Sequence, residues 1–166
     1  MTAAPPGNPA LRDPAHQVSP KAPRLWTVGA AFRSLVILIA LLVVQVAGWW
    51  DVPWWVWPPL VGACGVYVLV MPRVRYRIHR WESTDTAVYT QTGWLGRERR
   101  IAPMSRVQTV DFQQTAVSRL FGLATVTVTT ASAAGPLRIG DIDKQVADRL
   151  VEDLTRRAEA EAGDAT

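Results

Sequence analysis

Arginine is the residue type whose spacing most strongly suggests chemistry in this 166-residue chain. Guanidinium groups bind phosphate and carboxylate oxygens through paired, charge-assisted hydrogen bonds. Nine of the arginines that follow residue 72 form two groups and a single residue: Arg73, Arg75, Arg77 and Arg80; Arg97, Arg99, Arg100 and Arg106; and Arg119. Each of them is a candidate contact for lipid headgroups or for acidic groups of a partner protein.

The distribution of charge sharpens this hypothesis. Residues 73–110 contain eight arginines and three acidic residues, a net charge of +5, whereas residues 111–166 carry a net charge of −3. Anionic lipid attracts each basic residue near its surface by roughly 1 kcal/mol. The first arginine group can therefore hold a domain against a membrane, or it can serve only to set membrane orientation. The sequence leaves both alternatives open.

Catalytic and metal-binding patterns are not found in the sequence. The chain has one cysteine and two histidines, and it lacks a glycine-rich phosphate loop, Gly-x-Ser-x-Gly and His-Glu-x-x-His. His79 stands among arginines, where we expect a solvated side chain on a strand, and Asp141 and Asp143 suit a helix N-terminus. We therefore expect no enzyme activity, no metal and no cofactor.

Two long apolar runs precede the arginine-rich half. Seventeen residues from Ser34 to Trp50 and eighteen from Trp54 to Met71 carry no charge. A bilayer core requires about 20 apolar residues, and roughly 17 suffice when flanking residues reach the interface. The alternative is a pair of buried helices in a soluble domain, but two such runs so close together favour a transmembrane hairpin.

The residues around these runs indicate the membrane boundaries. Tryptophan favours the headgroup region, and five tryptophans surround Asp51: Trp49, Trp50, Trp54, Trp55 and Trp57. We expect Trp26 at the opposite interface, with Arg33 and Arg73 extending to the headgroups. Pro58 and Pro59 suit the first turn of the second helix.

Membrane orientation follows from the positive charges. Basic residues lie before the first span and after the second, and the turn between them carries only Asp51. The positive-inside bias then predicts a multi-pass protein of the cytoplasmic membrane with both termini in the cytoplasm.

After the second run, apolar and polar residues begin to alternate, as they do in strands. We expect strands over Val74–His79, Thr86–Thr92, Arg97–Ala102, Arg106–Phe112, Leu123–Thr130 and Leu137–Ile139, with turn residues Gly93 to Gly96. Ile142, Val146, Leu150, Val151 and Leu154 then form a helical apolar stripe. The predicted organisation is a disordered tail (1–24), a helical hairpin (25–72), a β-rich domain (73–158) and a frayed end (159–166).

Two segments resemble a known family. RVQTVDF from Arg106 and RLFGLATVTVTT from Arg119, together with Gly93-Trp94-Leu95-Gly96-Arg97, resemble the bacterial pleckstrin-homology-like (PH-like) domain of YdbS-like membrane proteins. The resemblance covers roughly Arg73 to Leu154, and the hairpin before it also fits. It implies a bent antiparallel sheet of about seven strands capped by a C-terminal helix.

The resemblance implies less about ligands. Eukaryotic relatives of this fold bind phosphoinositides through basic residues in the first inter-strand loop. Here we expect that loop at Trp81–Asp85, which contains two acidic residues and no basic one, so the pattern argues against phosphoinositides. Nucleic acid is not expected as a partner either, because there is no basic helix or aromatic stacking ladder.

The sequence thus predicts a membrane-anchored, non-catalytic interaction module. By analogy with the family, its partner is a second copy or a larger membrane protein with several PH-like domains. The first contact surface we expect is Arg106–Phe121, with Gln108, Asp111, Gln113, Arg119 and Phe121; Val110, Phe121 and Leu123 favour core packing instead. The alternative function is to bind anionic lipid headgroups through the arginine groups. No small-molecule substrate is suggested.

Overall fold

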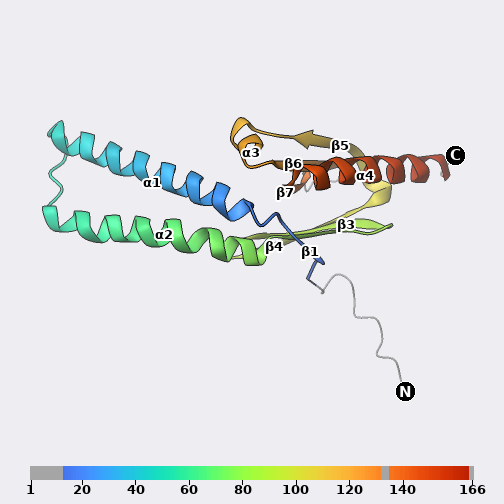
Figure 1. Cartoon of the computed structure of the whole chain (residues 1–166), viewed down its shortest axis with the longest axis horizontal. Coiled ribbons are helices and arrows are strands. Elements are labelled where there is room, and N and C mark those ends of the chain that lie inside the picture. Colours follow the sequence, from blue (N-terminus) through green and yellow to red (C-terminus); the bar gives the residue numbers. More distant parts are fainter. Residues whose placement is uncertain (1–12, 132–134, 165–166) are drawn as a thin grey trace, which may run out of the picture.

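The computed structural model describes residues 13–131 and 135–164 of the chain. Two long helices lie side by side and project from one end of a β-rich part (Figure 1). Seven antiparallel strands form two sheets that do not close into a barrel, and a C-terminal helix follows them. This arrangement confirms the predicted fold class.

The hairpin consists of α1 (Ala22–Val46), a short 3-10 turn η1 (Trp54–Val56) and α2 (Trp57–Ile78). Pro58 and Pro59 lie in the first turn of α2, as predicted, where a missing N–H leaves no intrahelical bond unmade. Gln45, the only amide of the first apolar run, closes the turn: it donates to the Val52 carbonyl over 3.2 Å and accepts the Trp57 indole N–H over 3.0 Å.

The two helices expose their apolar side chains. Each membrane-capable segment, Ala22–Val46 and Trp54–Ile78, has 25 residues and is therefore about 37 Å long, with the end nearest the β-rich part extending beyond the apolar run. Within the structure, only 11% and 6% of the most apolar 18-residue stretch of the first and second segment are buried. A pair of core helices in a soluble domain would be mostly buried, so the exposure favours the membrane interpretation.

The predicted strand over Val74–His79 is wrong, because α2 continues through it to Ile78. Alternation of six residues does not distinguish a strand from a helix, and extending a helix is easier than starting a new element. The packing selects the helix: Tyr76 packs against the domain core, while Arg77 remains exposed. Arg73, Arg75 and Arg77 therefore lie on a helix that leads out of the membrane.

The first sheet has the order β1-β2-β3-β4, with β1 at His16–Gln17, β2 at Arg80–Ser83, β3 at Ala87–Gly93 and β4 at Arg97–Pro103. Its short first strand corrects the prediction of a disordered tail up to residue 24. His16 pairs with Trp81, and Val18 and Ala22 are buried in the core. This segment is ordered because it fills a place beside β2. Residues 1–12 lie outside the described residues.

The second sheet has the order β5-β6-β7, with β5 at Val107–Gln113, β6 at Leu123–Thr130 and β7 at Leu137–Asp143. A 3-10 turn η2 (Met104–Arg106) joins it to the first sheet. Sequence reasoning missed a short helix, α3 (Ala116–Leu120), whose first turn is capped by the Thr115 hydroxyl accepting from the Ser118 N–H. Val110 and Phe121 pack against the core and Leu123 is buried in it, as predicted.

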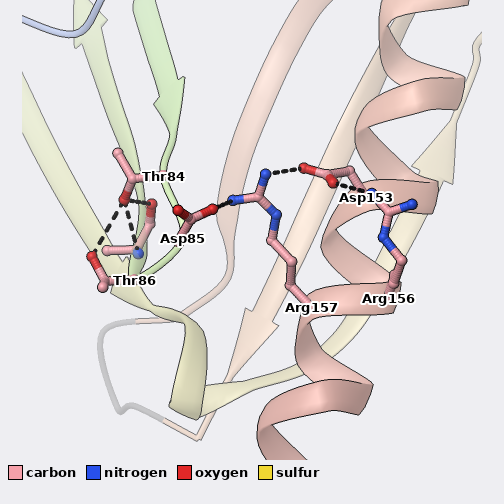
Figure 2. A network of polar contacts seen from close by, with 7 residues as sticks. Thr84, Asp85, Thr86, Asp153, Arg156 and Arg157 are labelled. Atoms are coloured by element: carbon pink, nitrogen blue, oxygen red, sulfur yellow. Dashed lines mark hydrogen bonds and ion pairs between the residues drawn. The ribbon is translucent and has the colours of Figure 1, made fainter.

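The C-terminal helix α4 (Lys144–Asp164) packs against the second sheet. Its buried stripe is Ala147, Leu150 and Leu154, whereas Val146 is exposed and Ile142 belongs to β7, so the predicted stripe is only partly right. The helix also extends past the expected end at Ala158, to Asp164. Its Arg157 pairs with Asp85 in the β2–β3 turn and with Asp153 one turn back (Figure 2).

Candidate functional site

A hollow of about 350 Å³ lies where the two long helices meet the first sheet. We call it the root hollow; it is lined by Arg33, Tyr67, Met71, Arg75, His79, Thr92, Gly93 and Trp94. The β3–β4 turn is held beside α2 by the rings of Tyr67 and Trp94, which meet edge to face at 5.8 Å. That turn requires Gly93, since a Cβ there would lie 1.8 Å from the Gly96 carbonyl oxygen.

Arg75 is fixed on one side of the hollow by three contacts. Its guanidinium carbon lies 4.3 Å from the centre of the Trp26 ring, a cation–π arrangement. Its Nε donates to Nε2 of His79 over 3.2 Å. Because Nε2 accepts that bond, we assign the imidazole proton to Nδ1, which then donates to the Arg75 carbonyl over 2.9 Å. The arginine therefore points in one direction before any ligand arrives.

His79 is held in its neutral form. Burial and, after it, the adjacent Arg75 guanidinium together lower the pKa of His79 to about 4, against opposing effects of the Arg75 carbonyl and Asp141. The prediction of a solvated histidine is wrong, because His79 is buried against Trp26 with the ring centres 5.1 Å apart. Its role is to position Arg75.

Trp26 joins the hairpin to the second sheet. Its indole Nε1 donates to Oδ2 of Asp141 over 2.7 Å, and the Ser19 N–H donates to the Asp141 carbonyl over 3.1 Å. Asp141 has a left-handed backbone with φ of 58°, and Lys21 bonds the neighbouring Asp143. Asp143, the last residue of β7, directly precedes α4, and both aspartates contact the N-terminal segment as well. Trp26 is buried and does not mark the opposite membrane interface, contrary to the expectation.

The predicted interface residues lie where the hairpin turns. The side chains of Trp49, Trp50, Trp54 and Trp55 are exposed around the turn, and Trp57 is half-buried on Gln45. Arg33 and Arg73 are exposed at the other end of the apolar stretches. Arg33 donates to the Tyr67 hydroxyl over 3.4 Å, whereas Arg73 donates to the Leu69 carbonyl.

The two arginine groups do not form one patch. Arg75 joins Arg33 in the root hollow, a pairing that sequence reasoning missed. On β4, Arg99 donates to Gln91 and Asp13, and Arg100 donates to Glu98 and the Pro136 carbonyl. Arg97, Arg106 and Arg119 are exposed on β4, η2 and α3. No cluster of three or more His, Cys, Asp or Glu suited to a metal ion occurs among residues 13–131 and 135–164.

The first inter-strand turn also differs from the prediction. Trp81, Glu82 and Ser83 belong to β2, and the turn consists of Thr84, Asp85 and Thr86. The Thr84 hydroxyl closes it by donating to the Ala87 carbonyl, and Asp85 faces Arg157 (Figure 2). The turn has no basic residue of its own.

Comparison with known proteins identifies this architecture. The family model described as the bacterial PH domain matches residues 25–158, which include α2, all but the first turn of α1 and all but the first strand. The chain belongs to this family.

A curated relative adds the membrane context of this bacterial PH-domain chain. This relative is the UPF0699 transmembrane protein YdbS of Bacillus subtilis (strain 168). The chain is 31% identical to it over 153 residues, a match that covers 87% of this chain and 93% of the relative. No solved structure matches the chain significantly. The protein is therefore a membrane-associated bacterial PH-domain protein of the YdbS family.

The expected contact surface of the PH domain lies mainly on β5. Gln108, Asp111 and Gln113 are exposed, as is Arg119, whereas Phe121 is half-buried. Within the described residues, β5 pairs only with β6, so its other edge has no strand beside it. The root hollow was missed because Tyr67 and Trp94 are far apart in sequence. The one available signal was a tyrosine within the second apolar run.

Proposed function

We propose that this protein is a membrane-anchored, non-catalytic module that pairs the edge of β5 with a strand of another membrane-anchored PH-like chain, either a second copy or a larger family member. The hairpin holds the domain at the cytoplasmic face, in line with the basic residues flanking both spans. The partner supplies backbone hydrogen bonds by adding a strand.

The contrast between two sheet edges supports the proposal. Edge strands are usually protected from pairing by charged side chains. The edge strand β4 has this protection, since Arg97, Glu98, Arg99 and Arg100 follow one another along it. The edge strand β5 has seven residues, VQTVDFQ, with a single charge at Asp111. A long, exposed and nearly uncharged edge suits a strand from another chain.

Lysines on β5 test the proposal in the full-length protein. Thr109 and Gln113 are exposed and share a face of the strand with Asp111. A photo-crosslinking residue at the exposed Gln108 should form a covalent adduct with the partner in intact cells. The adduct has twice the mass of the chain if the protein self-associates, and a larger mass if the partner is a larger protein. We expect Thr109→Lys/Gln113→Lys to reduce this adduct by about tenfold, because edge lysines oppose strand addition.

The control adds the same two charges elsewhere. Gln145→Lys/Thr155→Lys replaces exposed residues of α4 and should leave the adduct unchanged. Absence of any adduct at Gln108, or equal loss in both variants, would show that β5 is not the partner-binding edge.

A further inference from the structure

The root hollow contains two arginines that lack carboxylate partners within the described residues. Arg33 enters from α1 and donates to the Tyr67 hydroxyl, and Arg75 enters from α2 against Trp26 and His79. None of the eight lining residues is acidic. The Asp141 carboxylate acts on Arg75 from outside the hollow, where it accepts a hydrogen bond from the Trp26 indole N–H. Two guanidinium groups thus line one cavity, and within the described residues neither forms a direct ion pair there.

The hollow also contains neutral polar groups, since Thr92 and the Tyr67 hydroxyl lie beside the arginines. His79 adds no charge near pH 7, because burial lowers its pKa to about 4. Arg75 is held in place by the Trp26 ring and His79. A guanidinium that is fixed in advance loses less side-chain entropy when it binds an anion.

The position of the hollow relative to the apolar stretches indicates the source of the anion. Arg33 directly precedes the first apolar run, and Tyr67 and Met71 lie near the end of the second. The hollow therefore lies at the level where apolar helix surface ends, which is the headgroup region of a bilayer. At the same level the β3–β4 turn presents Leu95, which is 85% exposed next to Trp94.

We infer that the root hollow is a binding site for a phosphate-bearing anion, with Arg33 and Arg75 as its ligands and the phosphate group of an anionic phospholipid as its natural occupant. Two guanidinium groups converging from different helices match the oxygens of one phosphate. The site is separate from the β5 edge, so it is independent of the proposed protein partner.

The test uses the full-length protein in nanodiscs of mixed phosphatidylglycerol and phosphatidylcholine, with retained lipids counted by native mass spectrometry after release. Wild type should retain phosphatidylglycerol selectively. Arg33→Gln should lower that retention about tenfold, and folding should be preserved because Arg33 is exposed and makes one long hydrogen bond. Arg73→Gln is the matched control, since it removes an exposed arginine at the same end of the hairpin but outside the hollow.

A second arm separates lipid from soluble phosphate. Inorganic phosphate is added to the protein in pure phosphatidylcholine discs, with sodium chloride at equal ionic strength as reference. A rise in melting temperature for wild type but not for Arg33→Gln identifies a soluble phosphate compound as the ligand; no rise, with selective phosphatidylglycerol retention, identifies the lipid. The inference is overturned if neither anion binds, or if Arg33→Gln and Arg73→Gln reduce retention equally.

Discussion

Arg75 and His79 hold each other in place through two hydrogen bonds. The histidine is one helical turn beyond the arginine. Its ring therefore accepts a hydrogen bond from the Arg75 guanidinium and donates one to the Arg75 backbone carbonyl. This arrangement requires a neutral imidazole, because a second ring proton would face the guanidinium. The low pKa of His79 results first from its burial and then from the adjacent Arg75 guanidinium.

Acidification should weaken the fold through His79. Its pKa is about 4 in the folded protein against 6.5 when unfolded, so between these values the unfolded state binds more protons and stability falls as pH falls. The full contribution is present above pH 6.5, and the loss approaching pH 4 is up to about 3 kcal/mol. Thermal unfolding in detergent between pH 7 and 4.5 measures it. A His79→Gln variant should lose this part of the pH dependence; an unchanged profile would contradict the assignment.

Replacing Trp26 with phenylalanine should separate its hydrogen bond from its packing. The change keeps an aromatic ring under Arg75 but removes the indole N–H that bonds Asp141. Because that bond is to a charged group, we expect a loss of about 2 kcal/mol in unfolding free energy. Denaturant unfolding in detergent measures the loss, and Trp94→Phe, on the exposed β3–β4 turn, provides the control. Equal losses in the two variants would exclude a special role for the Asp141 bond.

At the scale of elements, α4 is held by burial more than by its ion pairs. Leu154 is fully buried, whereas the Asp85 side chain that pairs with Arg157 is 96% exposed (Figure 2). Exposed ion pairs contribute little to stability, while a buried leucine contributes both its transfer free energy and the filling of a cavity. Shortening the leucine should therefore matter far more than removing the aspartate.

Paired substitutions on α4 test this ranking. Leu154→Ala should cost about 3 kcal/mol of unfolding free energy, and Asp85→Ala should leave it unchanged within measurement error. Denaturant unfolding in detergent, followed by circular dichroism, measures both. A large effect of Asp85→Ala would mean that the β2–β3 turn and α4 are coupled by more than a surface ion pair.

Elements with long, regular patterns were predictable from the sequence. Short elements, and elements that depend on contacts with a distant segment, were not. The strand at Leu123–Thr130 is found with its predicted bounds because valines and threonines alternate over its whole length. Val74–His79 was mistaken for a strand because its alternation is short and α2 simply continues. The strand at His16–Gln17 carries no local signal, since its two residues are ordered only by pairing with β2. The root hollow was not predictable for the same reason, since its lining residues come together only through tertiary contacts.

At the scale of the whole molecule, the antiparallel hairpin places the residues before α1 and after α2 at the same end (Figure 1). The β-rich part therefore lies on one side of any membrane that the helices cross, and the tryptophan-rich turn lies on the other. From the charge asymmetry across the hairpin we predict, by the positive-inside bias, that the β-rich side faces the cytoplasm.

Reporter fusions check this orientation. Alkaline phosphatase, which is active only outside the cytoplasm, should be inactive when fused after Thr166 and active when inserted at Asp51. Green fluorescent protein after Thr166 should fluoresce, which controls for expression. Phosphatase activity at the C-terminus would reverse the orientation and remove the proposed cytoplasmic partner.

The segment from Asp13 to Trp26 has a consequence for how the protein is made. Its first strand leaves the ribosome before either membrane helix, yet β2 and Asp141 are synthesised only after both. The β-rich part can therefore complete its core only when the hairpin has turned back, so membrane insertion and domain closure become successive steps of one biogenesis pathway. A fragment that starts after α2 would lack Val18, Ala22 and Trp26 from its core.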